Sequence, residues 1–439
     1  MLGGGTFLTQ NKALPGAYIN FVSVAAARAE LSDRGIATIA LELDWCAEQS
    51  IFRVEQSDLI RESVRIFGHA YTDDELRPLR ELFRHSRTVW LFRLNPATGG
   101  VKAQNTFATA KYTGTLGNSL KTVITASEDS TTEAPLYDVS TYLGTTLIDE
   151  QRNISQMSDL AANDFCTWKS AATLTTTAGT AFTGGTNGTV TAASHQTYLD
   201  QAESVTFNAM GCVSSESSVK ELYVAYTRRM RDEVGKKFQL VLRSKLADHE
   251  GVVSVKNGLI DSADSTALVP WVLGVVAGTA VNASATGLPY DGEYDVDAGY
   301  TQTQLEAAIA EGSFTLHRVD DEICVLRDIN TFTAFTDEKS EDFASNQVMR
   351  VLDQIANDIA LLFAKRYLGK VPNDAGGRAS FRSAVVTHHE ELQRLRAIED
   401  FKPERLTAEA GATRRAIALT DYVKPVTAME QLYMYVYVQ

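Results

Sequence analysis

Three short segments of the chain hold side chains whose types and spacing could do chemistry. The first is Val234-Gly235-Lys236-Lys237, which ends in the manner of a phosphate-binding P-loop. Met230 stands where the first glycine of such a loop belongs, and Lys237 replaces the hydroxyl residue that would hold magnesium. The sequence therefore favours a basic helix end over a nucleotide site.

The second segment is an acidic loop. Its carboxylates are two residues apart, as in calcium-binding loops: Asp291, Glu293, Asp295 and Asp297. Counted from Asp295, Glu306 falls at the twelfth position, but Tyr300 occupies the sixth, where the sharp turn requires glycine. A solvated acidic loop is the favoured interpretation, and a calcium site is the alternative.

The third segment is His388-His389-Glu390-Glu391, which does not have the HExxH spacing of zinc proteases. Neighbouring side chains on a helix point in different directions, so two such imidazoles converge poorly on one ion. We expect His388 to pack in the core and His389 to face solvent. Because the sequence also lacks a GxSxG elbow and a GxGxxG loop, we predict no enzyme activity, no cofactor and no metal.

Charged residues form two long stretches of opposite sign, one basic from Lys220 to Lys245 and one acidic from Asp291 to Asp342. They could be neighbouring faces of one domain. They could also meet between copies of the chain, and a head-to-tail contact of that kind gives rings or helical filaments. The candidates for inter-subunit charge pairs are Arg228, Arg229, Arg231, Lys236 and Lys237, with Asp291, Glu293, Asp295 and Asp297.

The composition sets limits on these possibilities. The chain has 439 residues, 44% hydrophobic and 22% charged, with a net charge of −14. This is enough for two to four domains, and the negative charge argues against nucleic acid as a partner. The four cysteines are scattered, so we expect reduced, buried thiols. We expect no signal peptide and no membrane insertion, because the most apolar stretch is short and is interrupted by Pro270 and two glycines.

Hydrophobic periodicity predicts a multidomain α/β fold in five regions. We expect an N-terminal arm at residues 1–24, a small α/β domain at 25–97, and a Thr/Gly-rich β-sandwich insertion at 98–190. A second α/β domain follows at 191–330. The last region, 331–439, holds two amphipathic helices and a final strand.

That final strand is the most distinctive element. Tyr433, Tyr435 and Tyr437 alternate with apolar residues from Leu432 to Val438, and no charge interrupts them. An uncharged apolar strand with unpaired backbone N–H and C=O groups recruits other chains unless it is paired with another strand. It is either a central strand of the molecule's own sheet or a strand donated to a neighbouring copy.

Several blocks of sequence together resemble one known family. They are Gly3-Gly4-Gly5-Thr6-Phe7, Pro15-Gly16-Ala17-Tyr18-Ile19-Asn20-Phe21, Arg327-Asp328-Ile329-Asn330-Thr331, Asn346 to Asp353, Tyr367 to Val371, and Pro425 to Val436. In this order they resemble the contractile-tail sheath proteins of myophages and R-type, phage-tail-like bacteriocins.

The resemblance implies a structural subunit that stacks as six-fold rings around an inner tail tube and contracts to drive the tube through a cell envelope. It implies a β-sandwich insertion, a subtilisin-like α/β domain without proteolysis, and a C-terminal α+β assembly domain. Baseplate and tail-terminator proteins would be partners, and assembly would occur in the bacterial cytoplasm. The alternatives are another self-assembling phage structural protein or, less favoured, an α/β binding module or enzyme.

On this resemblance both ends of the chain add strands to sheets of adjacent subunits. The N-terminal interface residues would be Tyr18, Ile19, Asn20, Phe21 and Val22, and the C-terminal ones Leu432, Tyr433, Met434, Tyr435, Val436, Tyr437 and Val438. Hinges would lie at Gly3, Gly4, Gly5, Gly16 and Pro425, where glycine frees the backbone or proline interrupts it.

Overall fold

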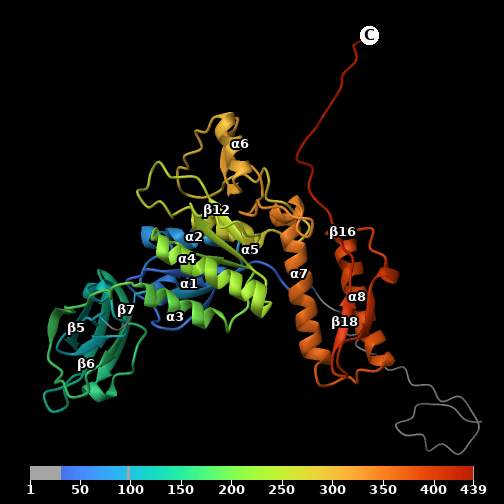
Figure 1. The fold of residues 1–439 in the computed structure, drawn as a ribbon. Coiled ribbons are helices and arrows are strands. Elements are labelled where there is room, and N and C mark those ends of the chain that lie inside the picture. The colour runs from blue at the N-terminus through green and yellow to red at the C-terminus, as the bar shows by residue number, and fades with distance from the viewer. Residues whose placement is uncertain (1–30, 96–98, 439) are drawn as a thin grey trace, which may run out of the picture. The chain divides into compact units, whose positions relative to one another are not determined.

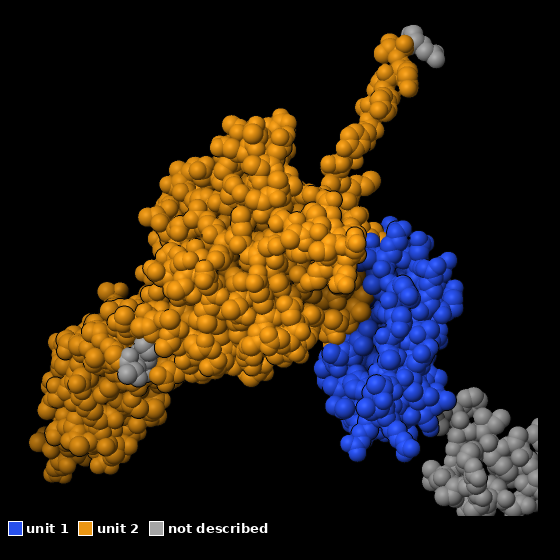
Figure 2. Space-filling model, viewed as in Figure 1, with its two compact units in different colours: residues 1–32, 358–425 blue, residues 33–357, 426–439 orange. Residues whose placement is uncertain are grey.

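A computed structural model of the protein describes residues 31–95 and 99–438. The chain divides into two compact units (Figure 2), which are described separately. The larger unit comprises residues 33–357 and 426–439, and the smaller one comprises residues 1–32 and 358–425. The division falls inside helix α7, Asn346–Leu362.

A seven-stranded sheet forms the centre of the larger unit. Its order is β13-β12-β11-β10-β1-β3-β2, and all neighbours are parallel except β2 and β3. The strands are β1 Ile36–Leu41, β2 Phe52–Glu55, β3 Thr88–Arg93, β10 Ala209–Gly211, β11 Gln239–Arg243, β12 Val252–Val255 and β13 Ser313–Phe314.

Helices cover both faces of this sheet (Figure 1). On one face the core includes side chains of α1 Gln56–Phe67, α2 Arg77–Phe83 and α5 Val269–Gly278. On the other face it includes side chains of α3 Ala192–Ala202 and α4 Ser217–Arg228. Because both faces are buried, strands such as Ile36–Leu41 are apolar almost throughout.

Helix α5 is buried almost from end to end, as its Ala/Gly/Val-rich sequence predicts. It lies unusually close to α2. A Cβ atom on Gly278 would stand 1.8 Å from the carbonyl oxygen of His85, and one on Gly274 would stand 2.5 Å from that of Leu82. Only glycine, which has no Cβ atom, allows the backbone of α5 to lie this close to the two carbonyl oxygens.

The region between β3 and α3 is a separate β-rich module. A four-stranded antiparallel sheet has the order β7-β6-β5-β9, and β4 pairs with β8. The strands are β4 Ala108–Ala110, β5 Leu120–Ala126, β6 Tyr137–Leu143, β7 Thr146–Ile154, β8 Cys166–Trp168 and β9 Thr177–Ala181. Trp45, from the loop after β1, packs into this module against Tyr112 and Phe165.

The larger unit also contains α6 Gln302–Ala310 and a hairpin of β14 Leu316–Val319 and β15 Glu322–Val325. The hairpin turns at Asp320, which has a φ of +50°. Short 3₁₀ helices occur at Asp74–Leu76, Thr115–Ser119, Met157–Asp159 and Glu341–Ala344, and a π-helical turn, Arg229–Val234, prolongs α4.

The smaller unit is built on helix α8, Ala375–Arg394. β16 Ile398–Glu399 pairs with β19 Lys424–Pro425, and β17 Thr407–Ala410 pairs with β18 Ile417–Thr420. A π-helical turn, Phe363–Tyr367, and a 3₁₀ helix, Pro403–Arg405, complete the elements.

Both histidines of α8 are buried, which corrects the expectation for His389. His388 Nε2 lies 3.0 Å from Asp358, and His389 Nε2 lies 2.7 Å from Asp421. His389 is fully covered because Phe401 and the segment around Asp421 pack over that side of the helix.

The four cysteines are free and buried, as predicted. Burial raises the pKa of Cys46 and of Cys166 to about 12 and that of Cys212 to about 11. Within residues 31–95 and 99–438, no helix has the length and apolar character needed to cross a membrane.

Candidate assembly site

The alternating segment Leu432–Val438 is exposed along its whole length. Its side chains are between 70% and 94% exposed, and it pairs with no strand of the described chain (Figure 1). The interpretation as a central strand of the molecule's own sheet is therefore wrong. The alternation of side chains encodes only a preference for strand, and no strand within residues 31–95 and 99–438 pairs with the segment.

The residues just before this segment are attached to the larger unit by three polar contacts. The amide of Ala428 donates to Gln347 Oε1 at 2.9 Å. The carboxylate of Glu430 accepts from Arg327 Nε at 2.8 Å and from Thr286 Oγ1 at 3.0 Å. We call these residues, 428–430, the root of the C-terminal segment. The segment beyond the root is exposed, but its point of departure is fixed.

A cavity of about 660 Å³ borders the root. Its lining includes Ile309, Arg327, Glu341 and Gln347 as well as the root itself. The root therefore bridges an open depression on the surface and does not merge with the core.

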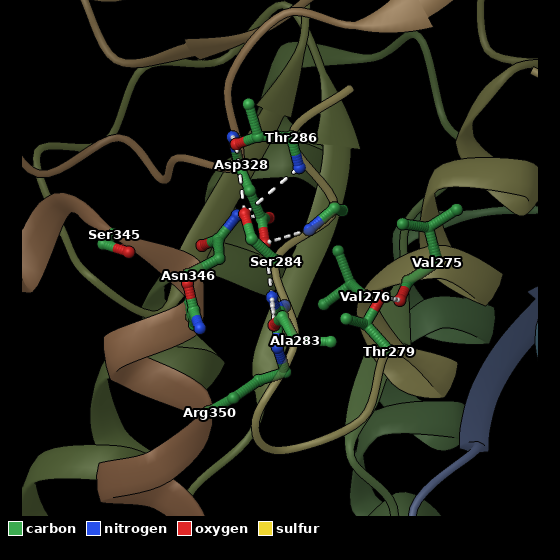
Figure 3. Close-up of polar contacts among 12 residues, drawn as sticks. Val275, Val276, Thr279, Ala283, Ser284, Thr286, Asp328, Ser345, Asn346 and Arg350 are labelled. Carbon is green, nitrogen blue, oxygen red and sulfur yellow. Dashed lines mark hydrogen bonds and ion pairs between the residues drawn. The ribbon is translucent and has the colours of Figure 1, made fainter. Parts of the chain in front are cut away.

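Behind the root lies a fully buried polar network (Figure 3). Asp328 accepts hydrogen bonds from Arg350, from the Ala285 amide at 2.9 Å and from Asn346 Nδ2 at 3.0 Å. Asn346 in turn accepts from Gln239 at 2.7 Å. Because Asp328 and Arg350 are each 2% exposed, these charges depend on one another and on the surrounding amides.

The network and the root share neighbouring residues. Asp328 and Asn346 point inward, whereas the adjacent Arg327 and Gln347 hold the root. Thr286 joins both sets, since its hydroxyl accepts from the Asp328 amide at 3.0 Å and donates to Glu430. The buried pair thus fixes the backbone that carries the surface contacts.

Helix α7 has two further anchors in the larger unit. Arg231 and Asp353 form a two-point ion pair with distances of 2.7 and 2.8 Å. The amide side chain of Asn357 bonds both the amide and the carbonyl of Lys237. Arg231 is 2% exposed, so it is engaged inside the chain and we withdraw it as an inter-subunit candidate.

Other charge candidates also have partners within the chain. Glu293 pairs with Arg80 at 2.8 Å, and this bond holds the pKa of the Glu293 carboxyl below its usual value. Asp291 accepts from Trp271 Nε1 at 2.8 Å, and Arg229 pairs with Glu203.

Lys236 and Lys237 bond main-chain carbonyls, and burial lowers the pKa of Lys236 to about 8. The helix before them ends at Gly235 with φ of +86°, so the predicted basic helix end is confirmed. Five of the nine candidates are exposed: Arg228, Arg229, Asp291, Asp295 and Asp297.

The predicted N-terminal hinge and interface residues lie outside the described residues: Gly3–Gly5, Gly16 and Tyr18–Val22. Pro425 ends β19 and stands at the boundary between the two units.

Residues 34–94 match the tail sheath protein Gp18 domain III N-terminal region, 95–187 the phage tail sheath protein beta-sandwich domain, 188–331 the central domain, and 338–439 the C-terminal domain. The crystal structure of a sheath tail protein from Desulfitobacterium hafniense is 35% identical, with a TM-score of 0.82 over 94% of this chain and 98% of that one. The chain belongs to the phage tail sheath family.

Two other relatives of this sheath protein add detail. The phage-like element PBSX protein XkdK of Bacillus subtilis strain 168 is 28% identical over 471 residues, which is 98% of this chain and 99% of that protein. The helical sheath of the anti-feeding prophage in its contracted state has the same fold, with a TM-score of 0.58 at 12% identity over 97% of this chain and 99% of that one.

Sequence reasoning included Arg327, Asp328, Gln347 and Arg350 in the blocks that resemble the family but assigned them no role, and it missed Thr286. The signal was two pairs of adjacent polar residues, Arg327-Asp328 and Asn346-Gln347, inside the blocks that resemble the family. The contacts that hold the root join residues more than 80 positions apart in sequence, such as Gln347 and Ala428, so local pattern could not reveal them.

Proposed function

We propose that this sheath protein is the repeating subunit of a contractile tail sheath, and that its C-terminal segment adds a strand to a sheet of an adjacent copy. The single observation that carries this proposal is the exposed segment Leu432–Val438 on its anchored root. An isolated chain gains nothing from exposing seven consecutive residues of strand pattern. A neighbouring sheet edge would satisfy both their backbone groups and their apolar face.

Subunits joined in this way would stack as six-fold rings around an inner tail tube, with baseplate and tail-terminator proteins at the two ends. The residues Tyr18–Val22 would form the matching N-terminal arm. Assembly would take place in the bacterial cytoplasm, and the subtilisin-like α/β domain would serve as a non-catalytic scaffold. Membership of the sheath family and the sheath fold support this arrangement.

Contraction would move subunits between two packed arrangements while the arms remain paired. A small free-energy difference per subunit suffices, because many identical subunits switch together. Flexible points next to the arms are then required, and Gly3–Gly5, Gly16 and Pro425 are the candidates.

Negative-stain electron microscopy of the concentrated full-length protein tests the arm. Removal of Gln431–Gln439 leaves the root contacts of Glu430 in place, so the truncated chain should fold but form no tubes or stacked rings. Normal tubes from this truncation would contradict the proposal.

A pair of point variants makes the test sharper. Val436→Asp places one carboxylate in the segment, where the side chain is 70% exposed. Ile260→Asp places one on another exposed β-branched residue, 68% exposed, far from the segment in sequence. Only the first should abolish assembly; equal effects would show that added charge, and not the strand, is responsible.

A further inference from the structure

A histidine and three carboxylates converge beside the start of helix α2. His69 follows α1 directly after Gly68, which ends that helix with φ of +73°. Asp44 comes from the loop after β1, and Asp73 and Glu75 lie at the start of the 3₁₀ helix that leads into α2. None of these residues contributes to the sheath role described above.

The two nitrogens of His69 face different partners. Nε2 lies 2.8 Å from Asp44 Oδ1, a hydrogen-bond distance. Nδ1 lies 3.7 Å from Glu75 Oε2 and 4.0 Å from Asp73 Oδ2. The ring is held in place, since its side chain is only 12% exposed.

The carboxylates around His69 favour a bound cation. If Asp44 accepts the proton on Nε2, the lone pair of Nδ1 faces two carboxylates, and three electron-rich atoms share one small space. Either a proton on Nδ1 or a metal ion between the three atoms relieves the repulsion. A carboxylate behind a histidine that ligates with its other nitrogen is the usual support of a protein metal site.

We propose that His69 Nδ1, Asp73 and Glu75 bind one divalent transition-metal ion, and that Asp44 orients the imidazole. One imidazole and two carboxylates, with water in the fourth position, suit Zn²⁺. Bonds of about 2.1 Å in a tetrahedral site place ligand atoms about 3.4 Å apart. The two observed separations, 3.7 and 4.0 Å, must close by about 0.3 and 0.6 Å to reach that value. The side chains of Asp73 and Glu75, 43% and 56% exposed, have room to move.

The other cluster of suitable groups in the described chain is less fit for a metal. It comprises Asp232, His249 and Glu250. There His249 Nδ1 already accepts from the Gly251 amide at 2.9 Å, and Glu250 already pairs with Lys339 at 2.8 Å. At His69 the equivalent nitrogen accepts from no donor among the described residues. Asp73 Oδ2 accepts from the Ala70 amide at 2.7 Å, which leaves this carboxylate oxygen a second lone pair for the ion.

The ion would tie the turn between α1 and α2 to the loop that carries Asp44, 25 positions before His69 in sequence. The loop that carries Asp44 also carries Trp45, which packs into the β-rich module. Metal bound at His69 would therefore stabilise the junction of α1, α2 and this loop, and mass action predicts a higher unfolding temperature as Zn²⁺ is added.

The test is calorimetric titration of chelator-treated, full-length protein with Zn²⁺ alone. We expect one ion per chain. Glu75→Gln should weaken binding at least about tenfold, and Asp44→Asn by about 10–100-fold, the usual effect of losing the supporting carboxylate. The control is Asp74→Asn, which removes a carboxylate from the same turn and should change the affinity less than about twofold.

Two results would overturn the proposal. One is the absence of saturable binding at one ion per chain. The other is equal weakening by Asp74→Asn and Glu75→Gln, which would show that only diffuse negative charge attracts the ion. Cobalt absorption provides an independent readout, because tetrahedral Co²⁺ should give its visible bands in the wild-type chain and lose them in His69→Gln. The control His85→Gln should retain them.

Discussion

At the scale of single residues, Arg231 shows how burial changes the role of a charge. In the sequence it belongs to a basic stretch that could face another subunit. In the structure its guanidinium donates to Asp353 and to the carbonyl of Phe238, and almost none of it is exposed. The ion pair therefore attaches helix α7 to the end of helix α4, and it contributes to stability only while both partners are present.

We predict that Asp353→Asn destabilises the larger unit by about 3–5 kcal/mol, because it leaves a buried guanidinium without its counter-charge. Chemical denaturation followed by tryptophan fluorescence measures this, since all four tryptophans lie in the larger unit. The exposed pair of Arg229 and Glu203 supplies the control. Glu203→Gln should cost at most about 1 kcal/mol, and a similar loss in both variants would show that burial is not the cause.

Sequence alone could not separate these two arginines. Both stand in the same run, two positions apart, and the run has no periodicity that marks one as buried. The same limit explains His389, since its cover comes from Asp421 and Phe401, which follow after the end of α8.

At the scale of elements, the close contact of α5 with the segment after α2 depends on one missing side chain. Gly278→Ala would place a methyl group against the His85 carbonyl, at a distance no real contact allows. We predict a loss of about 1–3 kcal/mol from overpacking, measured by the same fluorescence assay. Gly299→Ala is the matched control, because its Cβ would meet nothing closer than 3.6 Å and its φ is ordinary. A neutral Gly278→Ala would mean that the helix can shift without cost.

The local sequence pattern predicted individual helices and strands well. The buried helix α5 and the β14–β15 hairpin follow from patterns within a few residues. The order of the parallel sheet does not, because β1 pairs with β3 and with β10, which lies about 170 residues later. The local sequence of a strand does not indicate which distant strand pairs with it.

At the scale of the whole molecule, the root fixes the point at which the C-terminal segment leaves the larger unit. The Arg327–Glu430 pair is partly exposed, 37% and 30%, so it adds little to the stability of the single chain. We predict that Arg327→Ala unfolds within about 1 kcal/mol of wild type yet forms fewer tubes, because the segment departs at the wrong angle. Sedimentation of assembled protein measures the effect.

The exposed arginine Arg318 on β14 provides the control, and Arg318→Ala should assemble normally. The charge-exchanged double variant, Arg327→Glu with Glu430→Arg, should recover part of the assembly. If Arg327→Ala assembles as well as wild type, the root has no part in directing the segment.

The burial of the four thiols has a practical consequence for chemical labelling of the protein during assembly. With pKa values far above neutral pH, Cys46, Cys166 and Cys212 hold almost no thiolate, so maleimides and oxidants react with them very slowly. Burial raises the pKa of Cys324 as well, so a cysteine placed at an exposed position such as Tyr435 should react much faster than the four native thiols. Fluorescent dyes or crosslinkers could be attached there without first removing any native cysteine.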